Sequence, residues 1–179
     1  RKYRIGPAET ANLGFTLSHE HLGTNAAGIL RTFPELIDRP GIIEEAKSTL
    51  KEASDEGLRT IIDVSTIDLG RDVEMMKEVS QATGVQIIAA TGNHLAVPRP
   101  FIDLAPEVIA YLYVREIEQG IEGTRIKTGI IKVASDEGGI TGSYRAKGLP
   151  KGETWAKTSR FGILRLAVQW LPYESGAFE

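Results

Sequence analysis

The sequence alternates strand-like segments with segments of helical periodicity, and this alternation constrains the fold more than any other feature. Four segments have the residue pattern of strands: residues 15–22, 60–64, 85–90 and 129–134. Three segments carry apolar residues at helical spacing and are each followed by a glycine: residues 41–56, 70–83 and 107–119. Strands that alternate with helices in this way predict βα units around a parallel sheet.

Two histidines, His19 and His21, stand two residues apart in the first strand-like segment. Side chains alternate between the faces of a strand, so both imidazoles are expected on one face and Glu20 on the other. Two neutral imidazoles that converge are a natural pair of ligands for a divalent transition metal. The alternative is that both are core or loop histidines satisfied by hydrogen bonds.

The composition excludes several classes of protein. The net charge of the 179 residues is −3, with acidic and basic residues interspersed, and no basic stripe suited to nucleic acid is present. The apolar runs are too short to span a membrane. There is no cysteine, so histidine, carboxylate or an unusual lysine must supply any metal ligands. We expect a cytoplasmic protein without nucleic-acid or membrane partners, with a periplasmic or secreted location as the alternative.

Polar residues follow the predicted strands at the edge where parallel sheets build their sites. They are His19 and His21, residues 63–66, Thr91 and Lys132. In open α/β sheets and in (β/α)8 barrels, this carboxyl edge carries the functional residues. No glycine-rich phosphate fingerprint follows any strand, which argues against a dinucleotide site.

Four segments together resemble the phosphotriesterase family of the amidohydrolase superfamily, which includes lactonase-like members. They are GFTLSHEHL at residues 14–22, DVSTIDLGRD at 63–72, AATG at 89–92 and GIIKVA at 129–134. The resemblance covers about residues 5–141 and implies a (β/α)8 TIM-barrel type of fold, present here as a half-barrel of the first four βα units. It also implies two divalent metal ions, zinc or otherwise cobalt, iron or manganese, with His19 and His21 as ligands. Lys132 would carry CO2 as a carbamate that bridges both metals.

A physical argument supports this role of Lys132. Burial and neighbouring positive charge lower the pKa of a lysine, and a neutral amine can add CO2 to give an anionic oxygen ligand. The alternative is a lysine that extends from the strand end into solvent. His94 follows the third strand, in the loop where family members place an aromatic residue against substrate. A histidine at this position departs from the family pattern. We expect His94 to hydrogen-bond a small-molecule substrate, and the alternative is an exposed loop histidine.

The resemblance ends near residue 141, and residues 142–179 are expected to form a divergent tail with one amphipathic helix over residues 160–171. No histidine follows His94 and no aspartate follows Asp136, so the further ligands of the family have no counterpart. We therefore expect a truncated family member. Its first and fourth strands would be open edges, and open edges favour homo-oligomers.

Three functions are compatible with these observations. The first is a metal-dependent hydrolase of organophosphate triesters or lactones. Residues 33–35 and 63–72 look closer to phosphotriesterases, and residues 135–141 look closer to lactonases. The second is a catalytically incomplete half-barrel that binds metal weakly or acts only by association with other chains. The third is a module that binds small molecules without metal.

Overall fold

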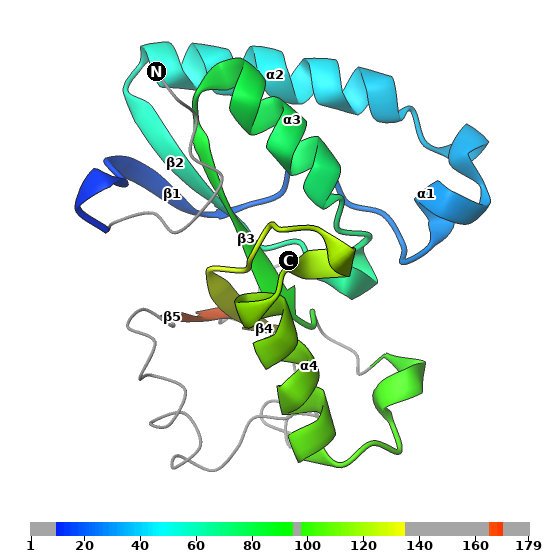
Figure 1. Cartoon of the computed structure of the whole chain (residues 1–179). Coiled ribbons are helices and arrows are strands. Elements are labelled where there is room, and N and C mark those ends of the chain that lie inside the picture. The colour runs from blue at the N-terminus through cyan, green and yellow to red at the C-terminus, as the bar shows by residue number, and fades with distance from the viewer. Residues whose placement is uncertain (1–9, 95–97, 135–164, 170–179) are drawn as a thin grey trace, which may run out of the picture.

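The computed structural model describes residues 10–94, 98–134 and 165–169, which form a parallel sheet with helices packed against it (Figure 1). The strands follow one another in sequence order: β1 (Phe15–Glu20), β2 (Leu58–Asp63), β3 (Gln86–Gly92), β4 (Ile130–Ala134) and β5 (Arg165–Gln169). Every neighbouring pair is parallel. The first four strands and their connecting helices form the half-barrel that the sequence predicted.

The helices lie in the connections between the strands. The α-helices are α1 (Ile29–Thr32), α2 (Arg39–Asp55), α3 (Val73–Thr83) and α4 (Pro106–Glu118). Short 3-10 turns are η1 (Thr10–Asn12), η2 (Pro34–Leu36), η3 (Ile67–Leu69), η4 (Arg99–Phe101) and η5 (Ile121–Gly123). Within the described ranges, no helix has both the length and the apolar character needed to span a bilayer.

Side-chain caps fix where α2 and α3 begin. The Asp38 carboxylate accepts a hydrogen bond of 3.0 Å from the Gly41 N–H, and the Asp72 carboxylate accepts one of 2.9 Å from the Met75 N–H. Each cap satisfies an N–H group that the first turn of a helix leaves without a partner. Helix α3 ends at Gly84, whose φ of 77° is left-handed. The caps and the glycine thus set the lengths of the helices that cover the sheet.

The main core lies between the sheet and the pair α2 and α3, which lie side by side on one face (Figure 1). Its buried members are Ile43, Ala46, Leu50, Leu58, Ile61, Met75, Val79 and Val85. A smaller cluster joins the residue after β2, the interior of β3 and the start of β4 through Val64, Ala90 and Ile130. Burial of one large aliphatic side chain contributes about 1.5–3 kcal/mol, so both clusters help to hold the strands together.

Two expectations about the strands were wrong. The helix expected over residues 160–171 is instead strand β5 over Arg165–Gln169, and the rest of that segment lies outside the described residues. A short apolar run does not distinguish helix from strand. As a strand, this segment pairs with the backbone N–H and C=O groups of β4, which a helix here would leave without partners. For the same reason β4 is not an open edge, because β5 pairs along its whole length.

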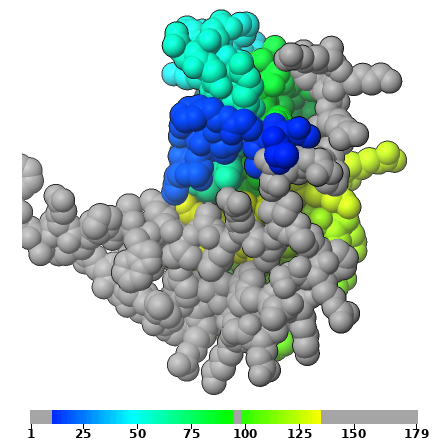
Figure 2. Space-filling view, turned by 90° about the vertical axis from the view of Figure 1, so that its left-hand side faces the viewer, coloured from blue at the N-terminus to red at the C-terminus, as the bar shows by residue number. Residues whose placement is uncertain are grey.

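Strand β1 is one edge of the described sheet, and β5 is the other. The side chains of β1 are unusually exposed for apolar residues, with Phe15 at 66% and Leu17 at 36%. The blue residues that include β1 lie at the surface in Figure 2. Homo-oligomer formation through this edge stays a prediction. Residues 1–9 and the lactonase-like residues 135–141 lie outside the described residues.

Candidate metal centre

The side chains of His19, His21 and Lys132 lie together at the carboxyl ends of β1 and β4. The Lys132 Nζ atom is 3.4 Å from His19 Nε2. The His19 and His21 ring centroids are 5.4 Å apart, with an interplanar angle of 69°. Lys132 is 1% exposed, whereas both histidines are exposed. Residues 113 positions apart therefore meet, and their role as metal ligands stays a prediction.

An irregularity of β1 lies in the segment that carries the two imidazoles. In the pairing of β1 with β2, Leu17 lies opposite Ile61 and Glu20 lies opposite Asp63, so β1 holds one extra residue between these pairs. The strand ends at Glu20, and His21 follows it. The two rings lie together, as the sequence predicted, although β1 is not a regular strand as far as His21. Bulges re-aim side chains and are common beside functional sites.

One buried carboxylate fixes the chain just after the bulge. Asp63 is fully buried and accepts hydrogen bonds from the Leu22 N–H, at 2.9 Å, and from the Ser65 N–H, at 2.8 Å. The Ser65 hydroxyl lies 2.9 Å from His21 Nδ1. The Asp63 side chain thus binds the backbone next to His21 and the backbone of Ser65, the two residues that make this contact. Sequence reasoning noted Asp63 and Ser65 as polar residues at a strand end but assigned them no role.

Burial shifts the pKa of each of the three candidate ligands toward its neutral form. Burial lowers the pKa of Lys132, and the nearby Asp68 carboxylate opposes this shift. Burial and Lys132 lower the pKa of His19. For His21, burial lowers the pKa, while Asp63 raises it in part. Neutral imidazole is the form that binds metal, and neutral amine is the form that adds CO2.

The end of β3 approaches the backbone of Lys132 very closely. Gly92 has φ of 105°, and a Cβ atom there would lie 2.0 Å from the Lys132 carbonyl oxygen. The next residue, Asn93, donates its N–H to the same oxygen at 3.2 Å. Only glycine allows both the backbone conformation and this approach. Gly92 and Asn93 therefore hold the Lys132 backbone in position.

His94 lies at the same edge of the sheet, in a loop held by two contacts. Its N–H lies 3.2 and 3.1 Å from the two carboxylate oxygens of Asp68. On the other side, the Tyr113 hydroxyl donates to the side-chain oxygen of buried Asn93. A positive charge on His94 would lower the pKa of His19, so the two histidines lie near one another. Contact of His94 with a substrate stays a prediction.

The residues present fit a divalent metal in part. Among the described residues, no group of three or more histidine, cysteine, aspartate or glutamate side chains is placed to hold a metal ion. His19 and His21 supply two nitrogen donors, and Lys132 becomes an anionic oxygen donor only after it reacts with CO2. Zinc sites use about four ligands. The described part of the chain therefore offers a partial coordination sphere.

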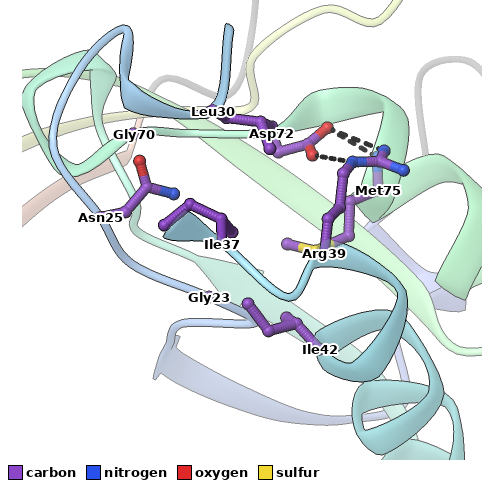
Figure 3. A pocket seen from close by; sticks show the side chains of 9 residues that line it. All are labelled: Gly23, Asn25, Leu30, Ile37, Arg39, Ile42, Gly70, Asp72 and Met75. Atoms are coloured by element: carbon purple, nitrogen blue, oxygen red, sulfur yellow. Dashed lines mark hydrogen bonds and ion pairs between the residues drawn. The ribbon is translucent and has the colours of Figure 1, made fainter. Parts of the chain in front are cut away.

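A small cavity lies away from these residues, between the β1–α2 connection and α3 (Figure 3). It is lined by Gly23, Asn25, Leu30, Ile37, Arg39, Ile42, Gly70, Asp72 and Met75. Its volume of about 20 Å³ is enough for a water molecule. The Asn25 side-chain oxygen is buried without a hydrogen-bond partner among the residues described. This cavity suits a structural water and is too small for an organic substrate.

A parallel half-barrel with two imidazoles and a buried lysine at the carboxyl ends of its strands is a part of a TIM-barrel type of protein with a candidate metal centre. Residues 2–148 match the phosphotriesterase family, and the chain belongs to this family. The match continues past residue 141, where the sequence analysis expected it to end.

Curated relatives carry hydrolase names of two kinds. The chain is 37% identical over 135 residues to the aryldialkylphosphatase of Saccharolobus solfataricus, which covers 74% of this chain and 43% of that protein. It is 37% identical over 147 residues to the phosphotriesterase homology protein of Mycobacterium tuberculosis, with coverage of 76% and 45%. It is 27% identical over 148 residues to the phospho-furanose lactonase of Mycoplasmopsis agalactiae, with coverage of 76% and 40%. The chain spans less than half the length of these relatives.

Proposed function

We propose that this chain supplies the first part of a metal-dependent hydrolase site for organophosphate triesters or lactones. In this proposal His19 and His21 bind one divalent metal, and Lys132, as a carbamate, bridges it to a second. Family membership supports the proposal, as do relatives named as an aryldialkylphosphatase and a lactonase.

The observation that carries the proposal is the position of the Lys132 amine, buried and 3.4 Å from His19 Nε2. A charged ammonium group is costly to bury. A neutral amine in the same place can attack the carbon of CO2 and release a proton, which leaves a carbamate whose two donor oxygens share one negative charge. The lowered pKa of Lys132 increases the fraction of neutral amine available for this reaction at a given pH.

Each residue then has a stated part in hydrolysis. Divalent metals bound here would lower the pKa of a water molecule and polarise the phosphoryl or carbonyl oxygen under attack. His19 and His21 serve as neutral nitrogen donors. His94, in the loop after β3, contacts the substrate at the mouth of the site. The Asn93 N–H, bound to the Lys132 carbonyl, and the Asp63 carboxylate keep the Lys132 backbone and the residues around His21 in place before any substrate arrives.

A second candidate is a half-barrel that binds metal without turnover. The observation in its favour is that the described residues hold no group of three or more histidine, cysteine, aspartate or glutamate side chains placed for a metal. With two imidazoles and one carbamate, the chain would bind metal more weakly than a complete site. This candidate and the hydrolase share the metal ligands and differ in catalysis.

Metal content and turnover test both candidates on the purified chain. The chain is loaded with Co²⁺ or Zn²⁺ in bicarbonate buffer, and bound metal is counted by elemental analysis. We expect metal in the wild type, its loss in His19→Ala and Lys132→Ala, and no change in Lys127→Ala, which alters an exposed lysine. A carbamate signal from ¹³C-bicarbonate should disappear in Lys132→Ala. Absence of metal from the wild type, or its retention in Lys132→Ala, would refute the proposed ligands.

Hydrolysis of paraoxon and of a homoserine lactone by the same samples separates the two candidates. Turnover that follows the bound metal supports the hydrolase and identifies the substrate class. Bound metal without turnover of either substrate supports the half-barrel that binds metal alone.

A further inference from the structure

We propose that Ser65 is a positioning residue for His21, whose Nδ1–H donates to the Ser65 hydroxyl so that Nε2 keeps the lone pair for a metal. The inference rests on the proposed function, because it concerns His21 as a ligand. Ser65 lies in the connection between β2 and α3, 44 positions along the chain from the histidine that it would orient.

The position of the Ser65 hydroxyl is fixed by its surroundings. Ser65 is fully buried, and its N–H donates to Asp63 Oδ1 at 2.8 Å. The other oxygen of Asp63 accepts the N–H of Leu22, the residue next to His21, at 2.9 Å. One buried carboxylate therefore holds the backbone of Ser65 and the backbone of the residue after His21, and Ser65 Oγ lies 2.9 Å from His21 Nδ1 between these two anchors.

The direction of the hydrogen bond decides which nitrogen can bind a metal. A neutral imidazole has one N–H and one lone pair, and a serine hydroxyl can donate or accept. The Asp63 carboxylate lies beside Ser65, and its negative charge favours an N–H group over a lone pair on the facing side of the ring. Nδ1 then carries the proton, and Nε2 is the free donor. Histidines that bind metals commonly donate their other ring N–H in this way.

With this hydrogen bond, both histidines would offer the same ring nitrogen, Nε2, to a metal. His19 already presents Nε2 toward the Lys132 amine, at 3.4 Å. With Ser65 as acceptor, His21 also offers Nε2. Without the hydroxyl, Nδ1–H loses its hydrogen-bond acceptor. The population then shifts toward the tautomer with the proton on Nε2, which imidazole side chains favour in water.

The tautomer of His21 can be measured without metal or turnover. The ¹⁵N-histidine-labelled chain is examined in EDTA, at a pH above the imidazole pKa values, by two-bond ¹H–¹⁵N correlation. We expect the proton on Nδ1 of His21 in the wild type and a shift toward Nε2 in Ser65→Ala, with rescue in Ser65→Thr. The matched control is Thr60→Val, which removes another fully buried hydroxyl of the β2 region, one that donates to the Leu13 carbonyl at 2.6 Å.

Co²⁺ titration of the same variants supplies the second readout. Loss of a partner of this kind weakens metal binding by about 10–100-fold, and we expect a loss of this size in Ser65→Ala and none in Thr60→Val. A wild-type His21 with its proton on Nε2 would overturn the inference, and this test needs no variant to fold. An unchanged tautomer in folded Ser65→Ala would also overturn it. If the wild type binds no Co²⁺ but the tautomer shifts as expected, the proposed function fails and the role of Ser65 stands.

Discussion

Replacing Gly92 with alanine tests how closely β3 must approach the candidate site. The new Cβ atom would lie 2.0 Å from the Lys132 carbonyl oxygen, and Cβ contacts under 3.0 Å essentially never occur in proteins. That oxygen belongs to the backbone of β4 and cannot rotate away. The strands would have to separate by at least 1 Å, and the Asn93 N–H would lose the same acceptor.

Gly57 offers a matched control for the backbone conformation. Its φ of 109° is close to the 105° of Gly92, but no atom lies within 4 Å of the position of its Cβ. In both variants the alanine sits in a strained backbone region, at a cost on the order of 1–3 kcal/mol. Gly92→Ala adds the collision, which as overpacking costs about 1–3 kcal/mol more. The difference between the two variants therefore isolates the close approach.

Urea unfolding followed by circular dichroism measures that difference. For a slope of about 1–3 kcal/mol per molar urea, a further 2 kcal/mol lowers the midpoint by roughly 1 M. Co²⁺ loading should fall in Gly92→Ala and stay unchanged in Gly57→Ala, because only the first variant displaces Lys132. Equal midpoints for the two variants would refute the reasoning, since β3 and β4 would then separate without cost.

Three further predictions concern other parts of the molecule. Tyr113→Phe should lower the free energy of unfolding by about 1–3 kcal/mol in urea, because it removes the hydroxyl that donates to buried Asn93. Lys132→Met should stabilise the chain at neutral pH in buffer free of metal and CO2. Burial lowers the pKa of Lys132 in the folded chain. Between that lowered pKa and the ordinary pKa of lysine the unfolded chain binds more protons, so the free energy of unfolding of the wild type should rise as the pH rises through this range. Lys132→Met should abolish this rise. Leu17→Lys should weaken self-association in sedimentation velocity, because a charge on the edge strand β1 opposes pairing.

Each of these variants has a counterpart that changes the same residue type at a different place. Tyr111→Phe alters an exposed tyrosine on the same helix, α4. Lys127→Met removes an exposed lysine, and Leu36→Lys adds a charge at an exposed leucine outside the sheet. A similar effect in both members of a pair would show that the mechanism given for that pair is wrong. No self-association in the wild type would contradict the prediction for β1.

Local patterns in the sequence predicted most of the helices and strands. The apolar spacing predicted a helix over residues 41–56, and α2 is Arg39–Asp55. It predicted another over residues 107–119, and α4 is Pro106–Glu118. Such patterns succeed because one face of each helix must bury its apolar residues against the sheet. The five-residue strand β5 was missed because a run of that length gives no distinct period.

The contacts within the candidate site were beyond local patterns. Ser65 meets His21 only because β1 and β2 pair in a particular register, and the bulge in β1 changes that register. No residue type in β1 indicates the bulge. The hydrogen-bonding role of Asp63 could have been predicted from the sequence. An aspartate at the end of a buried strand needs hydrogen-bond donors, and the residues after the neighbouring strand are the nearest source of backbone N–H groups.

The parts of the site that the chain supplies are fixed by backbone contacts that involve no metal. The Asp63 carboxylate holds the residues around His21, and the Asn93 N–H holds the Lys132 carbonyl. Metal binding would therefore need little rearrangement of this half, unlike sites that form only when metal folds the chain. In the proposed site the donors would be two imidazoles and one carbamate, and their number would limit the free energy of metal binding. We accordingly expect any added oxygen or nitrogen donor that reaches this edge to strengthen metal binding without altering the half-barrel.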